Sequence, residues 1–216
     1  MEWFRPNTVR PSLADQGQDA VEPSADASRI SRLAERVART LLRVDTLAIA
    51  LGANLPSPAG EPAVTLEAVK PLLHELLRPV GGRCHWSPLL RTAPVGGPAG
   101  QSDYLNAVVV VQLPAGWGAS SGITDQTAAQ SERHALELLQ GLQRLEARFG
   151  RPPLSQRQHW GPRSLDLDLL WWGDLHLDLP ATPTQPALHL PHPRWRERSF
   201  VVEPLAALLN AEGLLL

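Results

Sequence analysis

The spacing of apolar residues predicts alternating strands and helices from about residue 45 onward. Residues 46–51, "TLAIAL", form a short apolar run closed by the turn formers "GANLPSPAG", which indicates a buried strand. Residues 61–80 have helical spacing, with Pro62 suited to the first turn and Pro71 expected to kink the middle.

Two further strands, a long helix and a fourth strand are predicted in the second half of the chain. Residues 83–90 and 104–113 are the strands, separated by a Gly- and Pro-rich loop that is too long for a tight hairpin. Residues 125–150 are predicted to form a helix that carries an apolar stripe of Leu138, Leu142, Leu145 and Phe149 and is capped by Gly150. The fourth strand follows and contains Asp166 and Asp168. The order strand, helix, strand, strand, helix, strand predicts an α/β (α+β) domain with a ferredoxin-like split-βαβ sheet and helices packed on it. A short strand at 175–179 and a final helix at 192–209 complete the prediction.

The N-terminal part of the chain has a different pattern. Residues 1–27 lack apolar periodicity, which predicts a disordered leader. Residues 28–44 predict an amphipathic helix, with Ile30, Leu33, Val37 and Leu41 on one face. We expect this helix to pack on the domain formed by residues 45–216; contact with a membrane is the less favoured alternative.

Composition narrows the possible functions. The 216 residues, 43% of them hydrophobic and 19% charged, are typical of a soluble globular protein. A net charge of −2 gives no general attraction to nucleic acid or to an anionic membrane. Cys84 is the only cysteine, and the sequence contains neither a secretory signal nor a run of about 18 apolar residues, so we expect a cytoplasmic location. Lys70 is the only lysine, so arginine or backbone would have to hold any phosphate; genomic base composition explains the arginine excess equally well.

Two acids interrupt the apolar stretch "GPRSLDLDLL". On a strand Asp166 and Asp168 share one face, and we expect Leu165, Leu167, Leu169 and Trp171 to occupy the other, core-facing side. With their Cα atoms roughly 6.6 Å apart, the two charges repel by about 2.5 kcal/mol at an effective dielectric of about 20. A hard divalent cation such as Mg²⁺, which binds one or two carboxylates together with substrate phosphates, would neutralise the pair. Solvated acids on an edge strand are the alternative.

Arginines around the acid pair favour the cation interpretation. Arg163 precedes Asp166 by three residues, and Arg151 and Arg157 lie in the loop before it. Because guanidinium groups match phosphate oxygens, this pattern indicates a clamp for a metal-bound phosphate.

Other polar residues are candidates with open alternatives. Gln143 and Glu146 could hydrogen-bond a base or ribose, or form a solvated helix face. Tyr104 and Asn106 could stack on and hydrogen-bond a flat heterocycle, although Tyr104 could equally pack in the core. His192 could donate to phosphate, or be structural.

Four segments together closely resemble the 6-hydroxymethyl-7,8-dihydropterin pyrophosphokinase family of the folate pathway. They are "LGANL", "RTAPVGGPAGQSDYLNAVV", "GPRSLDLDLL" and "LPHPRWRERSFVVEPLAAL", and the resemblance covers about residues 46–208. It implies a ferredoxin-like domain that binds ATP with two Mg²⁺ ions and transfers the β,γ-diphosphate to the pterin hydroxymethyl group, releasing AMP. The partners implied are small molecules, ATP and the pterin, with neither nucleic acid nor membrane, and we expect a monomer.

The resemblance also implies residue roles. Asp166 and Asp168 would bind the metals, and Asp168 would act in catalysis together with Arg163 and Arg151, which would meet the phosphates. The ATP-binding residues would be Gln143, Glu146, Arg157, Trp160, Leu169, His192 and Arg198. The pterin-binding residues would be Gly52, Thr92, Val95, Tyr104, Asn106 and Phe200. The loop between residues 150 and 160 would close the site as a lid that excludes water.

The chain departs from the family pattern in several places. Ala187 and His189 stand where the family tends to have a basic residue and a hydroxyl that touch the nucleotide, the 114–124 insertion is unusual, and the C-terminal stretch is short. The extension of residues 1–43 could cover the surface that the short C-terminus leaves bare. A catalytically weakened pterin-binding or regulatory homologue is therefore the alternative to an active enzyme. An RNA-binding domain is disfavoured by the 3 Phe and 1 Tyr and by the net charge of −2.

Overall fold

The computed structural model describes residues 24–42, 45–114, 125–183 and 185–211. The helices are α1 (Ala25–Leu41), α2 (Pro62–Leu77), α3 (Asp125–Arg148) and α4 (Ser199–Ala211), with short 3-10 turns at Leu154–Gln156 and Trp195–Glu197. The strands are β1 (Thr46–Ala53), β2 (Arg83–Trp86), β3 (Leu90–Thr92), β4 (Tyr104–Gln112), β5 (Asp166–Trp172), β6 (Leu177–Leu179) and β7 (Leu188–Leu190).

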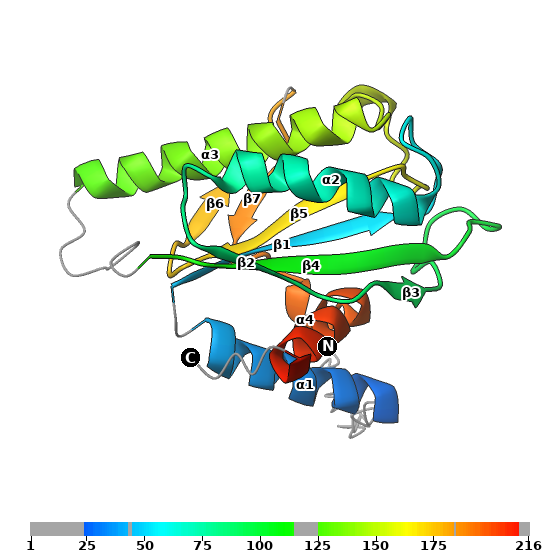
Figure 1. The fold of residues 1–216 in the computed structure, drawn as a ribbon, viewed down its shortest axis with the longest axis horizontal. Coiled ribbons are helices and arrows are strands. Elements are labelled where there is room, and N and C mark those ends of the chain that lie inside the picture. The colour runs from blue at the N-terminus through cyan, green and yellow to red at the C-terminus, as the bar shows by residue number, and fades with distance from the viewer. Residues whose placement is uncertain (1–23, 43–44, 115–124, 184, 212–216) are drawn as a thin grey trace, which may run out of the picture.

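These elements form a mixed α+β fold around an antiparallel sheet. The strand order is β2-β4-β1-β5, with β3 also paired to β4, and β6 and β7 make a separate two-stranded ribbon. In Figure 1, α2 and α3 cover one face of the sheet, and α1 and α4 cover the other. Because both faces are covered, β1 and β4 are buried along almost their whole length.

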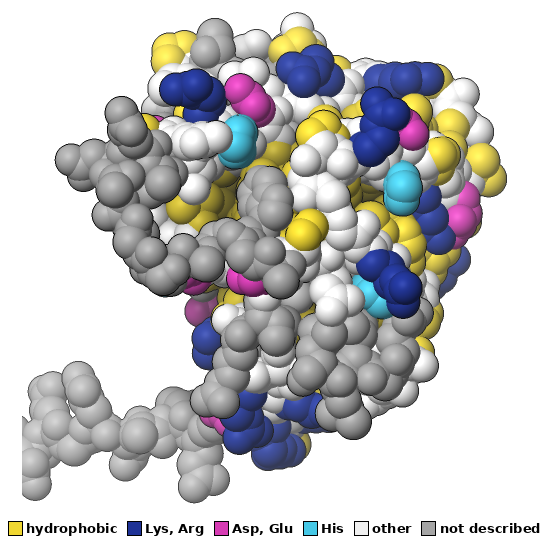
Figure 2. Space-filling view, turned by 60° about the vertical axis from the view of Figure 1, so that its left-hand side comes forward, with side chains coloured by type: hydrophobic (Ala, Val, Ile, Leu, Met, Phe, Trp, Pro, Cys, Tyr) yellow, Lys and Arg dark blue, Asp and Glu magenta, His cyan; other side chains and the backbone are white. Residues whose placement is uncertain are grey.

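The surface agrees with the near-neutral composition. On the face shown in Figure 2, Lys and Arg side chains are spread among acidic and apolar ones and do not gather into one basic patch. No helix in the described ranges is long and apolar enough to cross a membrane.

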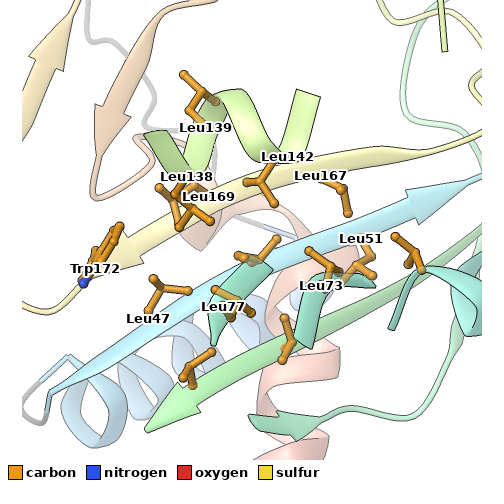
Figure 3. Packing of buried hydrophobic residues seen from close by; sticks show 14 of the residues in the cluster. Leu47, Leu51, Leu73, Leu77, Leu138, Leu139, Leu142, Leu167, Leu169 and Trp172 are labelled. Atoms are coloured by element: carbon orange, nitrogen blue, oxygen red, sulfur yellow. The ribbon is translucent and has the colours of Figure 1, made fainter. Parts of the chain in front are cut away.

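The two faces of the sheet carry separate apolar cores. The first core lies under α2 and α3 and includes Leu47, Leu73, Leu142 and Leu169, and Figure 3 shows these side chains meeting between the sheet and the two helices. The second core lies under α1 and α4 and contains side chains from all three central strands, including Ala48 of β1, Val110 of β4 and Leu170 of β5. Because side chains alternate along a strand, the same strands supply both cores, with successive residues facing opposite sides of the sheet.

One predicted orientation on β5 is wrong. Leu165, Leu167 and Leu169 face the first core as expected, but Trp171 lies in the second core and Trp172 in the first. The pairing with β1 skips a residue: Ile49 opposes Leu169, whereas Ala48 opposes Trp171. A β-bulge of this kind adds one residue to one strand and reverses the alternation beyond it.

Several predicted boundaries also shift. Helix α1 begins at Ala25, three residues before the expected start, because the Ser24 hydroxyl accepts a hydrogen bond from the Ala27 N–H (3.2 Å). The predicted strand 83–90 is divided into β2 and β3, with Pro88, which has no N–H, between them. Strand β7 was not predicted. Residues 1–23 of the predicted leader and 115–124 of the insertion lie outside the described residues.

Candidate active site

A cavity of about 390 Å³ opens on the sheet face that carries the acid pair. Most of the residues singled out from the sequence line it. They are Gly52, Thr92, Val95, Tyr104, Asn106, Arg151, Trp160, Arg163, Asp166, Asp168, His192, Arg198 and Phe200. Strands β1, β4 and β5, the loops on either side of them and the segment before α4 all contribute to this one site.

Strand register places the polar groups of the cavity floor side by side. Gly52 of β1 opposes Asn106 of β4 on one side and Asp166 of β5 on the other. Directly opposed residues in antiparallel strands share a face, so the amide and the carboxylate flank a position that has no side chain. A Cβ atom at Gly52 would lie only 3.1 Å from Asn106 Oδ1. The glycine therefore keeps the floor open between the two polar groups.

Asp166 is held by two arginines. Arg163 Nη1 lies 2.7 Å from Asp166 Oδ2, and Arg151 forms an ion pair with the other carboxylate oxygen. Burial alone would raise the pKa of Asp166, but the charges of Arg151 and Arg163 outweigh it and hold the pKa below its ordinary value. Asp166 therefore stays ionised over the whole neutral range.

Asp168 has a different balance of charges. Arg198 Nη1 donates a hydrogen bond to its Oδ2 over 3.0 Å. Burial and the neighbouring charge of Asp166 raise the pKa of Asp168, and Arg198 offsets only part of this. The repulsion between the two carboxylates expected from the sequence is thus present, and its effect is the raised pKa of Asp168.

Glu146 lies behind the cavity wall and holds two arginines of the loop. Its buried carboxylate accepts a hydrogen bond from the Leu167 N–H (2.9 Å), forms an ion pair with Arg151 and lies 3.2 Å from Arg157 Nη2. Burial and the charge of Asp166 raise the pKa of Glu146 to about 7, against the opposing effect of Arg151. Glu146 of helix α3 therefore acts on the site indirectly, through its ion pair with Arg151.

Four predicted ATP-binding residues are not brought to the cavity. Glu146 and Arg157 bind each other, and the Leu169 side chain packs in the first core on the opposite face of the sheet. Gln143 is not among the residues that line the cavity, and its buried Nε2 has no hydrogen-bond partner among the described residues. An unpaired buried amide is costly, so this atom is available to a ligand or a water.

A second group of side chains lines the part of the cavity next to β3 and β4. Asn106 Nδ2 donates a hydrogen bond to Thr92 Oγ1 (2.9 Å), and the Tyr104 hydroxyl donates to the Gly161 carbonyl (3.1 Å). The Trp160 ring is 48% exposed at the rim, on a backbone with φ of 51°. An aromatic ring, an amide and a hydroxyl on one wall suit a flat ligand with a polar edge.

His192 is fixed by the backbone around it. Its N–H donates to the Leu170 carbonyl (2.6 Å), and its Nδ1 accepts from the Arg194 N–H (3.1 Å). Burial, helped by the charges of Arg198 and Arg194, lowers the pKa of His192 to about 4. The ring is therefore neutral at pH 7 with its proton on Nε2, which makes it a hydrogen-bond donor and not a cation.

The structure also brings in residues that the sequence did not single out. Gln101 lines the cavity, and its Nε2 donates to the Trp160 carbonyl (3.2 Å), which joins the two loops at the rim. Buried Asn54 accepts a hydrogen bond from the Arg163 N–H (2.8 Å) and donates to the Ser102 carbonyl (3.0 Å). Both residues lie inside the quoted motifs "RTAPVGGPAGQSDYLNAVV" and "LGANL", so a signal was present although no role was assigned.

Asp166 and Asp168 form a candidate magnesium site. Within the described ranges, no group of three or more His, Cys, Asp or Glu side chains forms a complete metal cage. Asp166 and Asp168 nevertheless offer two carboxylates on one wall of a cavity large enough for phosphates. Two carboxylates completed by water and phosphate oxygens are the preferred environment of Mg²⁺, so the residues present fit this ion.

An acid pair, several arginines and a wall for a flat ligand around one cavity are the elements of a phosphoryl-transfer site. Comparison with known proteins identifies the family. Residues 123–210 match the family model described as 7,8-dihydro-6-hydroxymethylpterin-pyrophosphokinase (HPPK).

Two curated relatives match over most of their length. The 2-amino-4-hydroxy-6-hydroxymethyldihydropteridine pyrophosphokinase of Pseudomonas aeruginosa is 34% identical over 160 residues, which is 74% of this chain and 78% of the relative. The protein of the same name from Haemophilus influenzae is 31% identical over 74% of this chain and 79% of the relative. The chain thus belongs to the HPPK family.

Proposed function

We propose that the protein transfers the β,γ-diphosphate of ATP to the hydroxymethyl group of 6-hydroxymethyl-7,8-dihydropterin and releases AMP, as a pyrophosphokinase of folate biosynthesis. The observation that carries this proposal is the meeting of Asp166, Asp168 and three arginines with Tyr104 and Asn106 around one cavity. The first set suits a metal-bound polyphosphate and the second a flat heterocycle, and the reaction needs both next to each other.

Asp166 and Asp168 would hold the Mg²⁺ ions, of which we propose two. Bound there, the metal supplies neutralisation of the phosphate charge and alignment of the groups that exchange. Phosphoryl-type transfer depends mainly on positioning and charge, so the site needs no dedicated general base.

The arginines would exchange partners when ATP binds. Arg151, Arg163 and Arg198 now neutralise the two carboxylates. Each has further N–H donors in its planar fork that can take phosphate oxygens. We propose that Arg151 and Arg163 face the transferred diphosphate, and that Arg198 and the neutral Nε2–H of His192 donate to the nucleotide.

The part of the cavity next to β3 and β4 would hold the pterin. Asn106 and Thr92 present an amide and a hydroxyl to its polar edge, while Tyr104 and Phe200 line the cavity from different segments and could enclose the ring. The loop that carries Trp160 would close over both substrates and exclude water, which limits wasteful hydrolysis of ATP.

Further parts of the proposal concern the whole chain. We propose that the sheet is the ferredoxin-like split-βαβ type. The order β2-β4-β1-β5 supports this, because the two strands of each βαβ unit, β1 with β2 and β4 with β5, are separated by one strand of the other unit. Residues 25–27, predicted as part of the leader, belong to helix α1. The rest of the leader stays a prediction, and residues 45–216 would form the catalytic domain of a cytoplasmic monomer. His189, 44% exposed and paired with Asp178 over 2.7 Å, would contact the nucleotide little.

The test is AMP formation from ATP by the purified full chain. We expect formation that requires both Mg²⁺ and the reduced pterin and that stops when EDTA is added. AMP formation that is indifferent to the pterin would reject the proposal. The alternative of a weakened binding homologue would require calorimetric pterin binding without turnover, and the retained Asp166, Asp168 and Arg163 disfavour it.

A further inference from the structure

Helix α1 lies next to the segment that forms one wall of the cavity. It contacts α4 and also the Trp195–Glu197 turn that precedes α4. Figure 1 shows α1 alongside α4 on the sheet face opposite α2 and α3. This helix lies outside residues 123–210, the range matched by the family model.

An apolar seat joins α1 to Trp195. Ile30, Ala34, Val37 and Leu41 are the buried residues of α1, and all four belong to the same core cluster as Trp195, which is 2% exposed. The Trp195 ring also lies 5.3 Å from the ring of Trp171. The indole is thus enclosed by the helix on one side and by β5 on the other.

Polar contacts fix α1 at its two ends. Arg29 forms an ion pair with Glu203 of α4, and Arg36 Nη2 donates to Asn210 Oδ1 over 2.8 Å. At the C-terminal end, the Leu41 carbonyl accepts from Thr46 Oγ1 (2.9 Å), which in turn accepts from Trp171 Nε1 (2.9 Å). The helix is therefore tied to α4 and to two strands of the sheet.

The residues on either side of Trp195 line the cavity. His192 precedes it by three residues, and Arg198 and Phe200 follow within five. Between β7 and α4 the only regular structure is the short 3-10 turn that contains Trp195. Backbone hydrogen bonds hold the two ends of this segment, from the His192 N–H to the Leu170 carbonyl (2.6 Å) and from the Val202 N–H to the Arg198 carbonyl (2.9 Å). Trp195 is the one buried side chain between residues 191 and 198, so its packing anchors the middle of the segment. Arg198 reaches Asp168 from there over 3.0 Å.

We propose that α1 is a positioning element of the active site: by closing over Trp195 and packing against α4, it sets the position of Arg198, just before α4, and of Phe200, in the first turn of α4. This inference rests on the proposed function. A loosened α1 allows the segment to move, so that binding of both substrates weakens. The metal-binding carboxylates stay in place because β5 holds them. Weaker packing of α1 should therefore raise KM more than it lowers kcat.

Two valines form a matched test. Val37 of α1 and Val69 of α2 are both 0% exposed, but they belong to different cores, and Val69 lies on the opposite face of the sheet from Trp195. In the full chain, Val37→Ala and Val69→Ala remove the same two methyl groups and are both destabilising. We expect KM for ATP and for the pterin to rise about three- to tenfold in Val37→Ala, with little change in kcat, and to stay within about twofold of the parent in Val69→Ala.

Equal kinetic constants for the two variants, with equal shifts of the urea midpoint, would overturn the proposal and leave α1 a purely structural element. If Val37→Ala does not fold, Ile30→Val removes a single methyl from the same face and takes its place. If the parent chain itself forms no pterin-dependent AMP, the proposed function fails separately. The same pair is then compared by calorimetric titration with Mg-ATP, and binding by Val37→Ala that is no weaker than by Val69→Ala rejects the positioning role.

Discussion

The different charge surroundings of Asp166 and Asp168 predict that substituting one acid will destabilise the protein more than substituting the other. Asp166→Asn and Asp168→Asn each remove one negative charge and keep the shape of the side chain. Each also removes the same repulsion, about 2.5 kcal/mol for charges roughly 6.6 Å apart at an effective dielectric of about 20. That gain is common to both variants and cancels when they are compared.

What remains is the loss of arginine partners. Asp168 is 38% exposed and loses one contact, to Arg198 at 3.0 Å, and a screened pair of this kind contributes about 1 kcal/mol or less. Asp166 is 21% exposed and loses two, to Arg163 and to Arg151, whose side chain is only 12% exposed. Removing one partner of a buried ion pair costs about 3–5 kcal/mol, but Arg151 keeps Glu146 as a second partner, and Asp166→Asn also relieves the repulsion between Asp166 and Glu146. Asp166→Asn should therefore be less stable than Asp168→Asn by only about 1–2 kcal/mol.

Urea unfolding at pH 7 measures the difference, and AMP formation measures the shared consequence. With a slope of about 2 kcal/mol per M, the two midpoints should lie about 0.5–1 M apart, Asp168→Asn being close to the parent or above it. Both variants should lose at least about 100-fold in turnover, because each removes a proposed metal ligand. Equal midpoints, or a less stable Asp168→Asn, would refute the charge balance described for this site.

Three further predictions concern the walls of the cavity. Because the pKa of Glu146 is raised to about 7 from 4.5, its protonation makes the parent chain more stable as pH falls from 7 to 4.5; Glu146→Gln should lack this trend, and unfolding at pH 5 and pH 8 measures it. Gly97→Ala would place a Cβ atom 2.2 Å from the Trp160 carbonyl oxygen, whereas Gly100→Ala, at almost the same φ, meets nothing within 4 Å. Only the first should reduce kcat/KM, by about tenfold, and equal losses in both would point to backbone strain alone. His192, with its pKa lowered to about 4, should show no NMR titration between pH 5.5 and 8, and a midpoint above 6 would contradict its neutral assignment.

Local pattern was sufficient to predict most of the framework. The apolar run of 46–51 became β1 and the stripe from Leu138 to Phe149 became the buried side of α3, because periodic burial is a property of neighbouring residues. Gly150, expected to cap that helix, adopts a φ of 87°. Strand β7 was missed because three residues are too few to give a period.

Alternation along a strand also predicted the position of some residues of the candidate site and of its strands, but not of others. Tyr104 and Asn106 on one strand, and Asp166 and Asp168 on another, are two residues apart, so alternation alone places each pair on one face. Trp171 could not be placed by this rule, because the bulge that reverses it arises from the pairing of β5 with β1. Leu169 follows the rule and therefore faces the core, while the resemblance had assigned it to the nucleotide.

The sequence by itself determined most of the element order, the shared strand face of the acid pair, and the family, since each depends on residue identity and spacing along the chain. Only the tertiary structure decided which arginine neutralises which acid, that Glu146 acts from behind the wall, and that α1 closes over Trp195. Each of these is a contact between segments far apart in the sequence. The free energy of such a contact depends on the distance between the groups and on their burial, and neither can be read from spacing along the chain.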